Sequence, residues 1–228
     1  MSDFKKSRRS FLYATVLGGM SATPIAALAA GKAKEAKKEE EEVSPVEDLM
    51  REHGLLNRLL LVYDNVAEHL ERKENVDLSA LSDARNMIKT FIQGYHEENE
   101  EKYLFPRFKK ANKLTDLVAT LDAQHDAGRR ISALIPEAIK GNKRDSLAKY
   151  LRQFTHMYRP HEAREDTVLY PAFRKLVSDN EYDELGEQFE DREHQLFGKE
   201  GFEKNVVEIG KIEERLGIFN LAQFTPKV

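Results

Sequence analysis

The chain has 228 residues, of which 40% are hydrophobic and 33% charged, and this composition favours one helical domain with an appendage. The formal net charge is −4 and no basic block lies outside the N-terminus, which argues against nucleic acid as a partner. Because the chain has no cysteine, disulfides, thiolate zinc sites and iron–sulfur clusters are excluded, and any metal must be bound by nitrogen and oxygen.

The first 29 residues have the pattern of an export signal. Residues 7–12 (SRRSFL) resemble a twin-arginine signal, and the weakly apolar stretch that follows ends in Ala27-Leu28-Ala29. The resemblance implies export by the twin-arginine machinery, cleavage after residue 29, and a periplasmic or secreted mature protein. The alternative is an uncleaved membrane anchor, which is disfavoured because the stretch is short for a span and contains glycines and a proline.

Residues 30–43 predict a disordered charged linker, since they contain almost no large apolar side chain. A helix start follows directly: Ser44 is a good N-cap, Pro45 suits the first helical position, and Glu47 stands three residues after the cap. We therefore expect the folded domain to begin at residue 44.

Apolar residues at helical spacing predict four amphipathic helices joined by short loops. The expected spans are about 44–73, 78–106, 114–140 and 145–175. We expect the second to stop near Pro106, and Pro136 and Pro160 to bend the third and the fourth. The predicted fold class is all-α: an up-down-up-down four-helix bundle over residues 44–178.

A C-terminal helical extension is predicted within residues 179–228, where apolar and charged positions alternate between about 180 and 216. Its apolar residues exceed what a four-helix core needs, so they must pack somewhere. We expect a lid across one end of the bundle that brings His194 near a metal. The alternative is an assembly surface for a homodimer.

An internal repeat carries the main functional signal. Residues 96–108 align without gaps to residues 161–173, and both copies share a histidine, a glutamate four residues later, and a Leu-aromatic-Pro-x-Phe segment that we interpret as a helix ending. Residues four apart lie on one helix face. The repeat therefore predicts two inward pairs, His96 with Glu100 and His161 with Glu165.

Two further histidines, on the apolar faces of the first and third helices, complete a predicted dinuclear metal site. We assign Glu100 and Glu165 as bridges between two metals. Buried histidines and glutamates without a cation would be strongly destabilising. Imidazole and carboxylate without sulfur favour two iron ions, with manganese as the alternative. The predicted ligands are His53 and His96 on one metal, His125 and His161 on the other, and the bridges Glu100 and Glu165.

Over residues 44–178 the sequence resembles the hemerythrin-like (HHE cation-binding) family, through these same six residues. Two positions depart from the oxygen-carrying members. Arg129 stands where they have a second histidine on the third helix, and Asp166 matches their aspartate but competes with Glu165, which matches the first repeat better. The pattern is similar to a bacterial branch associated with redox chemistry of nitric oxide or peroxide.

Other residues are candidates for contact with the ligands or the metal. Tyr95 and Tyr158 precede ligand histidines; we interpret them as core aromatics, with a hydrogen bond to the site or ligation as alternatives. His194 is a weaker candidate, and His69 and His156 are expected at the surface. The full set expected beside the ligands is Tyr95, Tyr158, Asp166, Arg129 and His194.

The leading functional hypothesis is an exported non-haem di-iron protein that is redox-active towards O2, NO or peroxide, and so an oxidoreductase. The alternative is a protein that binds, stores or senses oxygen or iron without turnover. A third hypothesis, a metal-free helical interaction module, is disfavoured by the cost of the buried charges. The sequence contains no motif for an organic cofactor or a large substrate, and it identifies no catalytic residue beyond the metal ligands.

Overall fold

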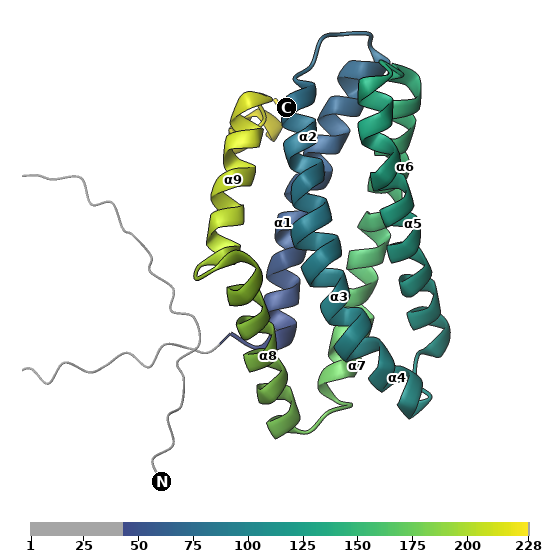
Figure 1. The fold of residues 1–228 in the computed structure, drawn as a ribbon, viewed down its shortest axis with the longest axis vertical. Coiled ribbons are helices and arrows are strands. Elements are labelled where there is room, and N and C mark those ends of the chain that lie inside the picture. Colours follow the sequence, from purple (N-terminus) through teal and green to yellow (C-terminus); the bar gives the residue numbers. More distant parts are fainter. Residues whose placement is uncertain (1–42, 228) are drawn as a thin grey trace, which may run out of the picture. The chain divides into compact units, whose positions relative to one another are not determined.

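The computed structural model describes residues 43–227, and within this range the fold is all-α with no strand, which confirms the predicted fold class (Figure 1). Within the described range, residues 44–227 belong to one compact unit. The predicted export signal, and the linker up to residue 42, lie outside the described residues. In the described part of the chain, no helix combines the length and the apolar character that crossing a membrane requires.

The first rod of the bundle is α1 (Pro45–Glu71), which begins where the sequence predicts. The hydroxyl oxygen of Ser44 accepts a hydrogen bond of 3.3 Å from the backbone N–H of Glu47, and Pro45 stands in the first turn. The cap therefore satisfies one of the N–H groups that a helix start leaves unpaired.

The second rod is continuous in space but alternates between α- and π-helical turns. It comprises α2 (Leu78–Met87), the π-helical η1 (Ile88–His96), α3 (Glu97–Asn99), the π-helical η2 (Glu100–Leu104) and α4 (Phe105–Ala111). The expectation that the helix stops near Pro106 is therefore wrong. The proline follows a π-helical turn, in which the α-helical bonding ladder has already changed, and the rod ends only at Asn112, whose φ is 52°.

The third rod is α5 (Thr115–Lys140), and the fourth comprises α6 (Arg144–Arg164), the π-helical η3 (Glu165–Leu169) and α7 (Tyr170–Arg174). Pro136 and Pro160 lie inside α5 and α6 without ending either helix. α1 packs against α2 and α6, and α5 packs against α6 and α2, so the four rods close into the predicted bundle.

The π-helical turns coincide with the repeat found in the sequence. η1 ends at His96, η2 begins at Glu100, and η3 begins at Glu165. In both copies the aromatic residue donates its backbone N–H to the glutamate five residues earlier, Phe105 to Glu100 and Tyr170 to Glu165. Single π-helical turns inside α-helices are frequent at functional sites.

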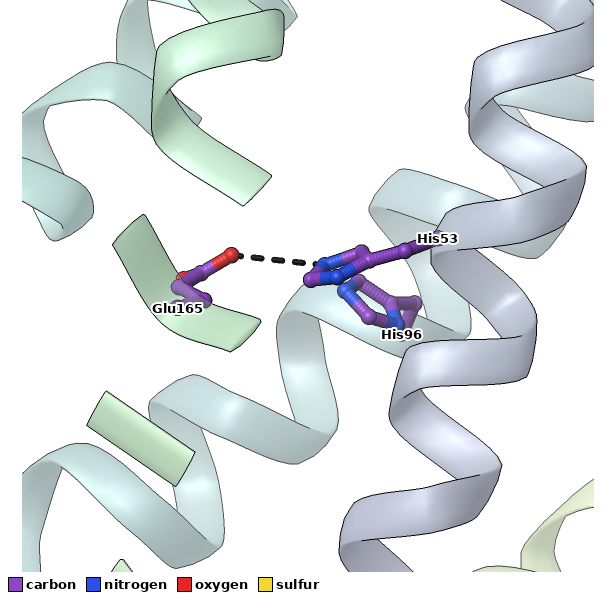
Figure 2. Close-up of side chains that lie close together, drawn as sticks. All are labelled: His53, His96 and Glu165. Atoms are coloured by element: carbon purple, nitrogen blue, oxygen red, sulfur yellow. Dashed lines mark ion pairs between the residues drawn. The ribbon is translucent and has the colours of Figure 1, made fainter. Parts of the chain in front are cut away.

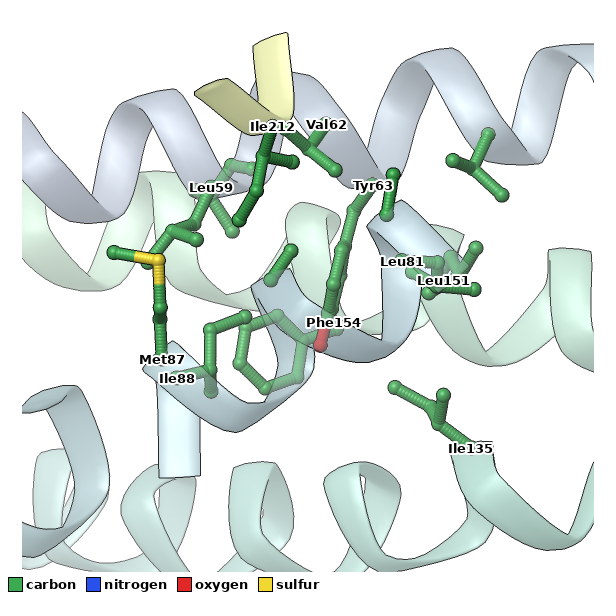
Figure 3. Packing of buried hydrophobic residues seen from close by; sticks show 14 of the residues in the cluster. Leu59, Val62, Tyr63, Leu81, Met87, Ile88, Ile135, Leu151, Phe154 and Ile212 are labelled. Atoms are coloured by element: carbon green, nitrogen blue, oxygen red, sulfur yellow. The ribbon is translucent and has the colours of Figure 1, made fainter. Parts of the chain in front are cut away.

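The core consists of two apolar clusters. The larger includes Tyr63, Ile88 and Phe154 and is shown in Figure 3; the smaller includes Phe108 and Phe173. Fully burying each such side chain contributes about 1.5–3 kcal/mol. In every rod the chain passes from one cluster to the other at a histidine, so a polar layer separates the two clusters. Its histidines are His53, His96, His125 and His161.

The C-terminal extension forms two helices, α8 (Asp179–Phe197) and α9 (Gly201–Arg215), and a short 3-10 turn η4 (Leu221–Phe224). The first of these helices ends at Gly198, whose positive φ of 75° is favourable for glycine. α9 lies along α1 and α2, and α8 lies along α1, so the pair covers a flank of the bundle and not one of its ends (Figure 1).

Ion pairs fix α9 on this flank. Arg58 of α1 donates from Nε to Glu213 at 2.9 Å, and Arg215 donates to Asp77 at the start of α2. Ile209 and Ile212 join the larger apolar cluster. The expectation of a lid is therefore wrong. The apolar residues of α9 pack against the flank of the bundle, and none of these contacts lies across its end.

Candidate metal centre

Six side chains from all four rods meet in the layer between the two apolar clusters. Each histidine is between 0 and 3% exposed, and both glutamates are 0% exposed. They are the six residues that the sequence proposes as ligands, and we call them the histidine–glutamate layer: His53, His96, Glu100, His125, His161 and Glu165.

Each carboxylate of this layer reaches one imidazole from each of two pairs. Glu165 Oε2 lies 3.4 Å from His53 Nε2 and 3.1 Å from His161 Nε2. Glu100 Oε2 lies 3.6 Å from Nε2 of His96 and 3.5 Å from Nε2 of His125. Two groupings suited to a metal ion result, which share Glu165: one adds His53 and His96 (Figure 2), and the other adds His125 and His161.

The other ring nitrogen of each histidine, Nδ1, is hydrogen-bonded to a side-chain oxygen from a neighbouring rod. Since ionised carboxylates and amide oxygens accept only, Nδ1 carries a proton in each ring, which leaves Nε2 as the nitrogen that faces the layer and is available to a metal. Metal-binding histidines are typically oriented in this way. The pairs are His53 with Asp166 (2.7 Å), His96 with Glu52 (2.8 Å), His125 with Glu101 (2.9 Å) and His161 with Gln124 (2.9 Å).

These four hydrogen bonds run around the bundle in a closed circle, because each rod accepts from the next. Every acceptor is also a sequence neighbour of a residue in the layer: Glu52 precedes His53, and Gln124 precedes His125. Likewise Glu101 follows Glu100, and Asp166 follows Glu165. The competition between Glu165 and Asp166 thus has a geometric answer, since Glu165 points into the layer and Asp166 supports His53 from outside.

The contacts within the histidine–glutamate layer favour a bound cation, because electron-donating atoms lie close together there without enough hydrogen-bond donors. Nε2 of His125 and Nε2 of His161 face each other at 3.2 Å, an approach that needs a proton or a metal ion between the two nitrogens. Glu100 Oε2 and Glu165 Oε1 are buried and have no hydrogen-bond partner in the described part of the chain. Such groups are costly in a dry interior unless a positive charge lies between them. Nitrogen and oxygen donors without sulfur suit iron or manganese.

Proton affinities in the layer point the same way. Burial lowers the pKa of His53, but hydrogen bonds to Asp166 and Glu165 outweigh it and raise that pKa to about 10. Burial and the negative charge of Glu165 raise the pKa of Glu100 well above its ordinary value. His161 and His53 overcome burial and hold the pKa of Glu165 well below its ordinary value. Protons therefore balance part of the negative charge, and metal ions would displace them.

The aromatic residues of the repeat cover this layer on one side. Phe105 stacks on His125 with ring centroids 5.5 Å apart, and Tyr170 stacks on His53 at 5.6 Å. The hydroxyl of Tyr170 also donates to Glu100 Oε1 at 2.8 Å. The sequence does not predict this role when the segment is interpreted as a helix ending; the aromatic residue shared by both copies of the repeat is the signal that points to it.

Arg129 holds the carboxylates behind His125. Its Nη2 lies 2.6 Å from Glu101 Oε1 and 2.9 Å from Glu97 Oε2. Tyr158 donates to Glu97 Oε1 at 2.6 Å, so both residues lie beside the layer as expected, acting through carboxylates. Gly128 allows this arrangement, because a Cβ there would lie 2.0 Å from the Tyr158 hydroxyl oxygen.

Two expected neighbours of the site point elsewhere. Tyr95 donates its hydroxyl to the backbone oxygen of Phe189 in α8 at 3.2 Å and so helps to attach the extension. His194 lies 3.9 Å from Glu190 on its own helix and belongs to none of the metal groupings in residues 43–227. The expectation that His194 lies near a metal is therefore wrong, because α8 lies along the flank of the bundle. His156 is exposed and His69 pairs with Glu74, as a surface position predicts.

Comparisons with known proteins agree with this geometry. The model of the hemerythrin HHE cation-binding domain matches residues 44–173 and also residues 116–199. Uncharacterised proteins of Mycobacterium tuberculosis and Mycobacterium bovis are 41% identical over 202 residues, which cover 86% of this chain and 79% of the relatives. No solved structure matches the chain. The chain belongs to the hemerythrin HHE cation-binding domain family.

Proposed function

We propose that the chain is an exported non-haem di-iron protein that reacts with O2, NO or peroxide by electron transfer. The observation that carries the proposal is the contact of each carboxylate with one imidazole of each pair, Glu165 at 3.4 and 3.1 Å and Glu100 at 3.6 and 3.5 Å. A carboxylate in that position can bridge two cations and reduce their repulsion.

In this proposal His53 and His96 hold one iron, and His125 and His161 hold the other, with Glu100 and Glu165 between them. A pair of irons with this ligand set supplies reversible one-electron changes and open coordination positions for a small ligand. The residues around the layer orient it: the Nδ1 acceptors fix each imidazole, and Tyr170 fixes Glu100.

The surroundings favour a small reactant. The layer lies between two apolar clusters, and its six side chains are at most 3% exposed. Apolar side chains such as Leu104 and Leu169 follow the bridging glutamates in the sequence and are 0% exposed. A diatomic molecule or peroxide fits such an environment, which also limits access of bulk water to the metals.

The test of the proposal is anaerobic iron loading followed by stopped-flow mixing with O2, NO and hydrogen peroxide. We expect about two irons per chain and fast oxidation of the diferrous protein with repeated turnover of peroxide or NO. One zinc, or no metal after loading, would disprove the di-iron assignment. A stable and reversible O2 complex without turnover would instead support the alternative, an oxygen-binding or sensing protein.

The proposed export has its own test. N-terminal sequencing of protein recovered from the periplasmic fraction should show cleavage after residue 29. Replacement of both Arg8 and Arg9 with lysine should retain the protein in the cytoplasm, because the arginine pair is what the twin-arginine signal presents. Export of that variant with normal efficiency would exclude this route.

A further inference from the structure

The two metal positions of the proposed dinuclear centre, on which this inference rests, differ in the groups behind their histidines. The first position is the pair His53 and His96, and the second position is the pair His125 and His161. The bridging carboxylates treat the two positions nearly alike, since Glu165 and Glu100 each contact one imidazole of each pair at similar distances.

The groups behind the imidazoles do not treat them alike. In the first position both Nδ1 atoms donate to carboxylates, His53 to Asp166 and His96 to Glu52. The Glu52 side chain is 2% exposed, so solvent screens its carboxylate little. Both imidazoles of this position therefore have a carboxylate as the acceptor behind them.

The second position has a weaker set. The Glu101 carboxylate behind His125 is shared with the guanidinium of Arg129, whose Nη2 lies 2.6 Å from the same oxygen, Oε1. The group behind His161 is the side-chain amide of Gln124, which is neutral and accepts through Oε1 at 2.9 Å. In the second position, His125 therefore donates to a carboxylate that Arg129 also contacts, and His161 donates to a neutral amide.

An anionic acceptor strengthens the hydrogen bond from Nδ1 and makes the opposite nitrogen a better electron donor to a metal. A neutral amide accepts a weaker hydrogen bond and increases the electron donation less. Better donation raises the affinity for a cation and favours its higher oxidation state. The two metal positions therefore differ in how strongly their imidazoles donate electrons. Part of this difference comes from Gln124, which is not itself a metal ligand, and part comes from Arg129, which weakens the Glu101 acceptor.

We propose that Gln124 is a positioning residue that makes the two metal positions unequal. The first position binds its metal more tightly and is oxidised first, and the second position binds more weakly and is oxidised last. The natural consequence is a stable mixed-valence form of the centre, in which the electron resides on the iron of the second position.

The test uses two isosteric variants with opposite charge changes, Gln124→Glu and Glu52→Gln. The first adds a carboxylate to the weaker position, and the second removes one from the stronger position. If the difference between acceptors sets the inequality, both variants narrow it. If only the total charge of the site matters, Gln124→Glu raises the metal affinity of both positions and Glu52→Gln lowers the metal affinity of both. In that case the ratio of the two dissociation constants stays unchanged. Tyr170, whose ring stacks on His53 and whose hydroxyl donates to Glu100, is unchanged in both variants.

The readout without redox chemistry is calorimetric titration of the metal-free full chain with Zn2+. We expect two steps in the unmodified protein, and about a tenfold smaller ratio of the two dissociation constants in each variant. With iron, electron paramagnetic resonance during a redox titration should show less mixed-valence species, with the comproportionation constant reduced about tenfold, or about 59 mV.

Unchanged ratios in Gln124→Glu, or a wider ratio in Glu52→Gln, would overturn the inference while leaving the dinuclear centre in place. Fewer than two metals in the unmodified protein would instead overturn the centre itself. Circular dichroism checks that each variant folds. If Glu52→Gln does not, Asp166→Asn replaces it, because that carboxylate is 35% exposed and supports the same position.

Discussion

The hydroxyl of Tyr170 donates a hydrogen bond of 2.8 Å to Oε1 of Glu100, which lies 70 positions earlier in the chain and in a different rod of the bundle. The same ring stacks on His53. The corresponding residue of the other repeat, Phe105, stacks on His125 without a hydroxyl. The two aromatic residues are therefore related by the repeat but differ at this one oxygen.

Tyr170→Phe should keep the stacking and lose the hydrogen bond to Glu100. Because such outer partners typically contribute 10–100-fold to metal affinity, we expect about a tenfold faster loss of iron to a chelator. Tyr182→Phe is the matched control, since its hydroxyl bonds to Ser44, outside the histidine–glutamate layer. Equal rates for the two variants would show that Tyr170 does not support the centre.

His96→Ala and His161→Ala should each lose much of the bound iron, because each removes one of the two imidazoles of a metal position. His156→Ala is the control on the same helix as His161, since His156 is exposed. Metal analysis after anaerobic loading checks the prediction. Full iron content in either ligand variant would remove that histidine from the proposed set.

Arg192 attaches α8 to the π-helical turn that carries His96. It donates to the backbone oxygens of Gly94 at 3.1 Å and Tyr95 at 3.3 Å, and to Asn99 Oδ1 at 2.5 Å. Arg192→Ala should lower the free energy of unfolding by about 1–3 kcal/mol, because it leaves mostly buried acceptors without a donor.

Denaturant unfolding measures this loss, and Arg192→Lys, which keeps the charge but not the fork of donors, should be intermediate. Lys211→Ala breaks an exposed pair with Glu208 and should change stability little. A loss in Arg192→Ala no larger than in Lys211→Ala would contradict this account of the flank.

The metal-free protein should lose stability as pH rises towards 10. The pKa of His53 is raised from 6.5 to about 10, with Asp166 and Glu165 outweighing the effect of burial. A raised folded-state pKa gives stability that is fully present below pH 6.5 and is lost as pH passes through the folded value.

Asp166→Asn should flatten this fall, because it weakens the hydrogen bond that raises the pKa of His53 most. Thermal unfolding of the metal-free protein between pH 6.5 and 10 measures the effect. Calorimetry of metal binding near neutral pH, in buffers of different ionisation enthalpy, should also show proton release. Parallel pH profiles for Asp166→Asn and the unmodified protein would count against this assignment.

The sequence by itself determined the features that depend on local periodicity. Apolar spacing gave the four rods, the Ser44 cap gave the start of α1, and the repeated His-x-x-x-Glu spacing placed His96 with Glu100 and His161 with Glu165 on inward faces. These follow from the geometry of a single helix, which residues within one or two turns specify.

Only the tertiary structure decided the relations between rods. Glu52, Glu101 and Gln124 are ordinary polar residues in a chain that is 33% charged, and their role appears when the bundle aligns each with a histidine from another rod. The same holds for the extension, whose apolar spacing predicts helices but not a partner. It lies on the flank because α1 and α2 present both an apolar side and the ion-pairing groups that match it, and no local pattern contains that information.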